Sequence, residues 1–115
     1  MTIKFLRLVM QSLKKDGIFI ARMPCADSPF FGCAAYNDIT HEWIATSGVI
    51  YHLLKMIGFK DVTILNDGPV PYKFVNLIRF CAFKLFCLFT SFACNFIGLG
   101  VPAIWTPNMW VVAKK

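Results

Sequence analysis

The sequence has few of the patterns that hold metals or disulfides. Its five cysteines include no CxxC pair, their number is odd, and neither His41 nor His52 stands at a ligand spacing from a cysteine pair. No secretory signal is recognised at the start of the chain. These absences predict free thiols in a protein of the reducing cytoplasm, with no bound metal.

The chain also lacks clustered charge. Its net charge is +6, yet adjacent basic residues occur only at Lys14-Lys15 and Lys114-Lys115. A nucleic-acid surface needs basic residues gathered on one face, so nucleic acid is not expected as a partner. A weak attraction to anionic lipid is the expected consequence of the scattered charge.

Hydrophobic residues are abundant by contrast. They make up 57% of the 115 residues, which include 12 Phe, whereas an average soluble domain has about 45–50%. The length fits one domain. The surplus has two explanations: the chain packs against more protein, or part of it meets a membrane.

The chain opens with a helical pattern. Apolar residues at helical spacing predict a helix over residues 3–13. Lys14 and Lys15 are expected in its last turn, where a cation suits the negative end of the helix dipole. Gly17 is expected to end the helix with a positive φ. The core stripe of this helix is predicted at Leu6, Val9, Met10 and Leu13.

A strand is predicted over residues 17–23. Residues 18–21 are apolar without alternation, which is typical of a strand buried on both faces. Pro24 ends it, and a loop of about twenty residues without secondary structure runs to Ala45. Loops of that length are usually functional or mobile.

A second helix and a second strand follow the loop. Thr46 or Ser47 can cap the helix through a hydroxyl, and Gly58 ends it. A strand over residues 62–65 then leads to the turn signal Asp67-Gly68-Pro69. The core stripe of this helix is predicted at Ile50, Leu53, Leu54 and Ile57.

Residues 73–98 form a long apolar run with scattered polar positions. At about 100° per residue these positions fall within an arc of roughly 160°, so a single helix here is amphipathic; a hairpin of two helices also fits. Residues 85–105 carry no charge and are about long enough to cross a membrane, although Gly98 and Pro102 interrupt them. Three alternatives stay open: a packing helix of a globular domain, which the pattern favours, a helix on a membrane surface, and a membrane span.

Two loop motifs carry the most specific signal in the chain. Residues 24–30 read PCADSPF and residues 38–42 read DITHE, and residues 105–108, WTPN, lead into a last strand. With the capped helix that follows, this succession resembles the second half of class I S-adenosylmethionine-dependent methyltransferases. Residues 13–17 resemble the turn before the fifth strand of that family. The loop motifs are similar to those of bacterial methyltransferase-domain proteins often associated with surface-polysaccharide or lipid-linked sugar synthesis.

The resemblance implies an α/β fold, namely strands five to seven of a Rossmann-like methyltransferase domain with flanking helices. Residues 17–23, 62–65 and 109–113 would be these strands, the last one antiparallel. The whole chain, residues 1–115, would be the C-terminal part of one domain. Residues 71–100 would be a long amphipathic helical insertion before the last strand, with a membrane surface as a candidate partner.

The resemblance also implies a cofactor, S-adenosylmethionine, for the intact enzyme. The sequence contains no GxGxG turn, and it has no counterpart of the acidic residue that holds the cofactor's ribose. No cofactor affinity is therefore expected from this chain alone. Its expected partner is a missing N-terminal half or a separate cofactor-binding chain.

The loop after the first strand is the expected site of chemistry, because ligands of open α/β sheets bind beside strand carboxyl ends. His41 is the candidate catalytic base, since its ordinary pKa lies near neutrality. Asp38 and Glu42 would orient its ring or contact the acceptor, together with Thr40. The alternative is that these residues form a local network that stabilises the loop.

Further candidates for substrate binding lie in the same loop. Asp27 and Ser28 would bind acceptor hydroxyls, with a turn before Pro29 as the alternative. Tyr36 and Trp43 would stack on a substrate ring, with a core position as the alternative.

The predicted function is methyl transfer to oxygen or nitrogen of a small or lipid-linked sugar acceptor, and this chain is expected to be inactive without its partner. The predicted place is the cytoplasm, including the inner face of the membrane. Two other readings stay open: a small membrane-associated protein with no enzymatic role, and a non-functional gene remnant that aggregates through exposed strand edges.

Overall fold

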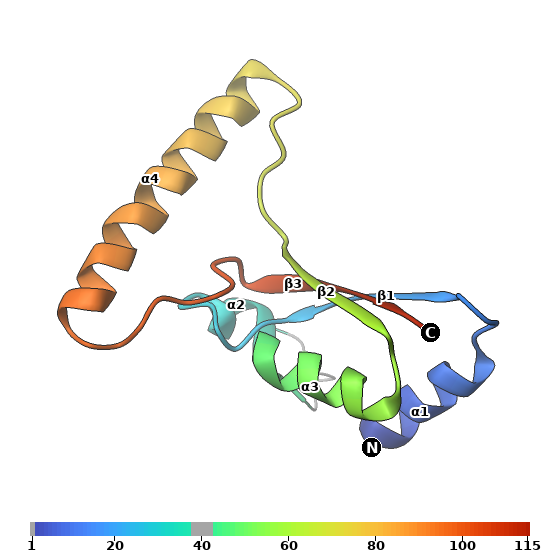
Figure 1. The fold of residues 1–115 in the computed structure, drawn as a ribbon. Helices are drawn as coiled ribbons and strands as arrows, with labels where there is room; N and C mark the ends of the chain where they lie inside the picture. The colour runs from blue at the N-terminus through green and yellow to red at the C-terminus, as the bar shows by residue number, and fades with distance from the viewer. Residues whose placement is uncertain (1, 38–42) are drawn as a thin grey trace.

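The computed structural model of the protein describes residues 2–37 and 43–115 (Figure 1). Helices and strands alternate, so the prediction of a mixed α/β fold is confirmed. In chain order the elements are α1 (Thr2–Ser12), β1 (Ile18–Pro24), α2 (Phe31–Ala35), α3 (Ser47–Ile57), β2 (Asp61–Asn66), α4 (Phe74–Phe96) and β3 (Asn108–Lys114).

The three strands form one sheet with the order β1-β3-β2. β3 is antiparallel to both neighbours, as predicted for the last strand, and β1 and β2 are therefore parallel to each other. Pro24 pairs with Asn108, and Asn66 pairs with Met109. The carboxyl ends of β1 and β2 thus meet at the same edge of the sheet, where β3 begins.

The core lies between one face of the sheet and the two helices α1 and α3. Both predicted helical stripes are confirmed: Leu6, Ile50 and Leu54 are buried, and the other stripe residues pack against them. Phe59 follows α3 and is buried, with its ring centroid 6.1 Å from that of Phe19 in β1. Met109, Val111 and Ala113 of the central strand complete this core.

The prediction that β1 is buried on both faces is wrong. Ile18 is 59% exposed and Ile20 is 60% exposed, whereas Phe19 packs against the core. Within the described residues, helices cover only one face of the sheet. Burial therefore alternates along β1, although residues 18–21 are all apolar. β1 is also an edge strand of this sheet.

The end of α1 differs from the prediction. The helix stops at Ser12, so Lys14 and Lys15 lie beyond its last turn. The positive φ falls on Asp16, at 62°, rather than on Gly17. Gly17 instead allows the backbone to pass close to the carbonyl oxygen of Lys14, because a Cβ at this position would lie 2.9 Å from that oxygen.

The cation at this end of α1 comes from elsewhere in the chain. Lys115 Nζ donates to the carbonyl oxygen of Leu13 at 2.6 Å. A positive charge there suits the negative end of the helix dipole, which was the role expected of Lys14 and Lys15. Only the folded sheet, with β3 beside β1, brings residue 115 to this position.

The described part of the segment between β1 and α3 contains structure that was not predicted. It contains the short helix α2, and a β-bridge joins Cys25 to Ala45. Trp43 packs against the core, which is the core alternative stated for it. The predicted caps of α3 are confirmed: Thr46 Oγ1 accepts from Val49 N at 3.2 Å, and Gly58 has a φ of 115°.

Residues 73–98 form one helix, α4, rather than a hairpin. The helix has 23 residues and buries none of its side chains. It projects from the rest of the molecule, as the orange ribbon in Figure 1 shows. One side of the helix contacts the rest of the chain, with the Phe86 and Phe30 ring centroids 5.7 Å apart, so the packing helix of a globular domain stays a prediction. By length and composition alone, α4 is also the one described helix that could cross a membrane.

Candidate functional site

Two cavities open at the edge of the sheet where β1 and β2 end. The first, of about 340 Å³, lies between the end of β1, α2 and the start of β3. Its polar side chains come from Arg22, Asn37 and Asn108. The remaining lining residues are Met23, Pro24, Cys33 and Ala34.

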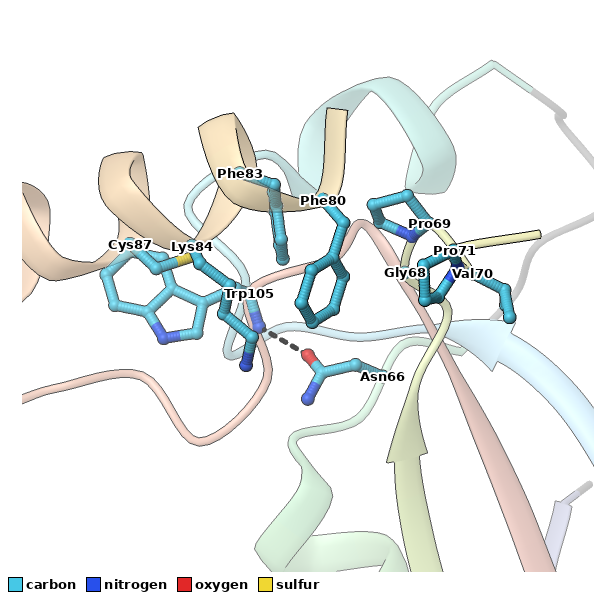
Figure 2. Close-up of a pocket in the computed structure, with 10 residues that line it drawn as sticks. All are labelled: Asn66, Gly68, Pro69, Val70, Pro71, Phe80, Phe83, Lys84, Cys87 and Trp105. Carbon is cyan, nitrogen blue, oxygen red and sulfur yellow. Dashed lines mark hydrogen bonds between the residues drawn. The ribbon is translucent and has the colours of Figure 1, made fainter. Parts of the chain in front are cut away.

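The second cavity, of about 360 Å³, lies between α4 and the loop that leaves β2 (Figure 2). Figure 2 shows Phe80 and Phe83 reaching from α4 toward Asn66 and Trp105. The backbone N–H of Trp105 donates to Asn66 Oδ1 at 3.0 Å, which fixes the floor of this cavity. The Nζ of Lys84 also lines it and lies 5.6 Å from the centroid of the Phe80 ring. The cavity is thus mainly apolar, with one cation.

A polar network joins the three strands at the same edge. Asp67 Oδ2 accepts from Arg22 Nε at 2.8 Å and from its Nη2 at 2.5 Å, and Asp67 Oδ1 accepts from Trp110 Nε1 at 2.9 Å. The Arg22 side chain is about half exposed, and such ion pairs contribute about 0–1 kcal/mol to stability. The main effect of the network is to orient Arg22 at the first cavity.

The buried hydroxyl group of Thr106 supports this network. Its Oγ1 accepts from the backbone N–H of Asp67 at 2.9 Å and donates to the carbonyl oxygen of Asn108 at 2.7 Å. The Thr106 hydroxyl therefore joins the loop after β2 to the start of β3. Both of its hydrogen bonds are made, as is usual for a buried polar group.

Asp27, a predicted substrate-binding residue, lies at the start of α3. Its Oδ2 accepts from the backbone N–H of Ser47 at 2.9 Å and, at a shorter distance, from the Ser47 hydroxyl. A carboxylate at a helix N-terminus satisfies an unpaired backbone donor and suits the helix dipole. Asp27 does not line either cavity.

We expect Asp27→Ala to lower the free energy of unfolding by about 0.5–2 kcal/mol, the usual effect of losing a helix cap. Asp27→Asn should lose less, because its amide oxygen can still accept. Urea unfolding followed by circular dichroism measures both variants. Unchanged stability of Asp27→Ala together with loss of acceptor binding would instead support the substrate-binding role.

Ser28 is 1% exposed and joins the first loop to the last one. Its Oγ donates to the carbonyl oxygen of Trp105 at 3.0 Å and accepts from the backbone N–H of Phe30 at 3.1 Å. The second bond closes a turn around Pro29, which corresponds to the turn alternative. The hydroxyl is thus engaged within the fold and lies outside both cavities.

The remaining predicted residues are Tyr36 and four residues that the structure does not describe. Tyr36 is 76% exposed and adjoins Asn37, which lines that cavity. Asp38, Thr40, His41 and Glu42 lie outside the described residues, so their roles stay predictions.

Cys25 follows β1 directly and is completely buried. Burial raises the pKa of its thiol above the ordinary value of 9.0, and the neighbouring Asp27 carboxylate adds to this. A raised pKa means that the folded state keeps the thiol proton after the unfolded state has lost it. The resulting stability is present below about pH 9 and is lost as the pH rises further.

We therefore expect the free energy of unfolding to fall as the pH rises above about 9. The free energy of unfolding of Cys25→Ala should fall less steeply. All five cysteines are free, with Cys33 and Cys81 exposed. In the folded protein an aromatic disulfide reagent should modify Cys33 and Cys81 rapidly and Cys25 only after unfolding. Equal modification rates for Cys25 and Cys33 would contradict the buried position.

Sequence reasoning missed Arg22, Asn66, Asp67, Asn37 and Asn108 as candidate site residues. Arg22 is the one charged residue in β1, and that feature could have singled it out. Asp67 was predicted only as the start of a turn, and Asn66 was not singled out. Among residues 2–37 and 43–115, no three His, Cys, Asp or Glu side chains are grouped so that they could hold a metal ion.

Residues 25–37, which follow β1, contain no glycine-rich turn for S-adenosylmethionine. β1 is followed by Cys25, Ala26, Asp27 and Ser28, and α2 begins only at residue 31. This segment contains no glycine-rich turn at a helix N-terminus of the kind that approaches a nucleotide cofactor.

No protein-family model matches the sequence, and no curated protein matches it significantly. Among solved structures, the chain is similar to a SAM dependent methyltransferase from Archaeoglobus fulgidus, with a TM-score of 0.60 and 17% sequence identity. The match covers 99% of this chain and 52% of that one, so this chain spans about half the length of the matched structure. In fold, the chain is similar to about half of a methyltransferase of that class.

Proposed function

We propose that the chain forms the acceptor side of an S-adenosylmethionine-dependent methyltransferase. The observation that carries the proposal is the fold similarity over nearly the whole chain to about half of such an enzyme. The two cavities at the carboxyl ends of β1 and β2 support it, because ligands of open α/β sheets bind at those ends.

The proposal includes a second component that binds the cofactor. The chain has no GxGxG turn, and the segment after β1 contains no glycine-rich turn for the cofactor. β1 presents an unpaired edge within the described sheet, and Ile18 and Ile20 are exposed beside it. An additional strand and a covering helix would pair this edge and bury these side chains.

The acceptor is proposed to be a small or sugar-linked molecule. Arg22, Asn37 and Asn108 offer the polar groups that hydroxyl-rich molecules need in a shaped cavity. His41 would remove the proton from the acceptor oxygen or nitrogen, and Asp38 and Glu42 would orient its ring. The similarity of the loop motifs to proteins of surface-polysaccharide synthesis favours a sugar.

The test is to isolate the native polypeptide from its source cell and assay methyl transfer. Mass spectrometry should find peptides encoded upstream of Met1, or a co-purifying chain, that carry a glycine-rich turn. The isolated material should transfer label from radiolabelled S-adenosylmethionine to a sugar fraction, whereas the 115-residue chain alone should bind no cofactor. Native material without a cofactor-binding component and without transfer would refute the proposal.

A further inference from the structure

α4 presents an entirely apolar side to solvent and a mixed side to the rest of the protein. The partly buried side carries the polar residues Asn76, Thr90 and Ser91 together with Phe80, Phe83, Cys87 and Cys94. At 100° per residue the opposite side is entirely apolar. We call it the outer face, and its central residues are Phe74, Ile78, Leu85, Phe89, Phe92 and Phe96, all of them exposed.

The exposed side of α4 is thus entirely apolar, unlike the exposed side of a helix on a soluble core. A surface helix of a globular protein normally turns its apolar stripe inward. Here Phe92 is 75% exposed and Phe96 is 86% exposed. The apolar surface continues past the helix, because Ile97, Leu99 and Val101 are exposed as well. A continuous apolar surface of this extent marks an interaction site.

The topology excludes a membrane span by α4. β2 leads into the helix and β3 follows it, yet these strands pair in one sheet, with Asn66 opposite Met109. Both ends of the connection must therefore lie on the same side of a membrane. A spanning α4 would force residues 97–107, which form no helix or strand, back through the hydrocarbon. Unpaired backbone groups are not tolerated there.

The charges around the outer face fit an anionic lipid surface. Lys73, Arg79 and Lys84 are exposed and flank it on both sides. No Asp or Glu occurs after Asp67, so the helix and the loop behind it carry only positive side chains. Phenylalanines on one face with lysine and arginine at its borders are typical of helices that lie in a membrane interface.

We infer that α4 lies in the plane of a membrane surface, with its outer face in the boundary between headgroups and acyl chains. Lys73, Arg79 and Lys84 contact anionic headgroups. The inference stands independently of the proposed methyltransferase role, because it rests on the orientation of α4, the pairing of β2 with β3 and the local charge.

Vesicle binding by the 115-residue chain tests the inference. The chain should sediment with vesicles of phosphatidylcholine and phosphatidylglycerol at 7:3, and binding should weaken at high salt and with pure phosphatidylcholine. Alkaline carbonate should release the chain, as expected for a helix that does not span. Phe89→Glu and Phe92→Glu should each reduce the partition coefficient at least about tenfold, because each removes a Phe that the membrane would cover. Met56→Glu, at an 81% exposed position on α3, is the matched control and should bind normally.

Two native cysteines report the orientation of α4 without mutation. Cys81 is exposed on the outer side of the helix, and Cys33 is exposed on α2. A charged maleimide should modify both in solution, whereas vesicles should protect Cys81 and leave Cys33 reactive. Full reactivity of Cys81 with bound vesicles, resistance to carbonate, or protection by self-association without lipid would each overturn the inference.

Discussion

Phe59→Ala is expected to lower the free energy of unfolding by about 3–5 kcal/mol, the range for truncating a buried Phe. Phe59 is 2% exposed, and its ring packs beside Phe19 of β1 while its backbone N–H donates to the carbonyl oxygen of Leu54 at 3.1 Å. It therefore links the end of α3 to the sheet. Small domains have only about 5–15 kcal/mol of stability, so the variant should lose much of its cooperative transition.

The same chemical change on α4 provides the control. Phe92→Ala removes an identical ring from a position that is mostly exposed, and in lipid-free solution its stability should stay within about 0.5 kcal/mol of the parent. Urea unfolding of both variants, followed by far-ultraviolet circular dichroism, measures the difference. Equal losses for the two variants would mean that α4 is packed against the body in solution.

The second large effect is expected on catalysis. If the native protein has the proposed methyltransferase function, His41→Gln should lower kcat by about 10²–10⁴-fold with little change in KM for the cofactor, because glutamine cannot remove a proton at neutral pH. His41 lies outside the described residues, and the prediction rests on its position in the sequence between β1 and α3. The measurement is label transfer from S-adenosylmethionine by the purified enzyme.

His52→Gln is the matched control for this prediction. His52 is exposed on α3 and stacks edge-on with Tyr51, with ring centroids 5.5 Å apart. Its replacement should leave kcat and KM unchanged. If His41→Gln retains the parent kcat and instead lowers stability, the loop-stabilising alternative for Thr40, His41 and Glu42 would be correct.

Local features were predictable from the sequence because their causes are local. The cap at Thr46 and the left-handed Gly58 follow from hydroxyl and glycine chemistry at helix ends. The apolar stripes of α1 and α3 follow from helical spacing, and the antiparallel last strand followed from the family resemblance. Asp27 and Ser28 were recognised as special, but their partners Ser47 and Trp105 are distant in sequence, and only the fold identifies them.

The sequence by itself determined the strands, the helices other than α2, the composition of the core and the amphipathic character of residues 73–98, because these depend on spacing and side-chain chemistry along the chain. Only the tertiary structure decided which sides of these elements are covered. It left Ile18 and Ile20 exposed, together with the outer face of α4. It also paired β2 with β3, so that the connection containing α4 leaves and re-enters the same sheet. Periodicity separates the two sides of a helix or strand, but contacts between distant segments decide which side is buried.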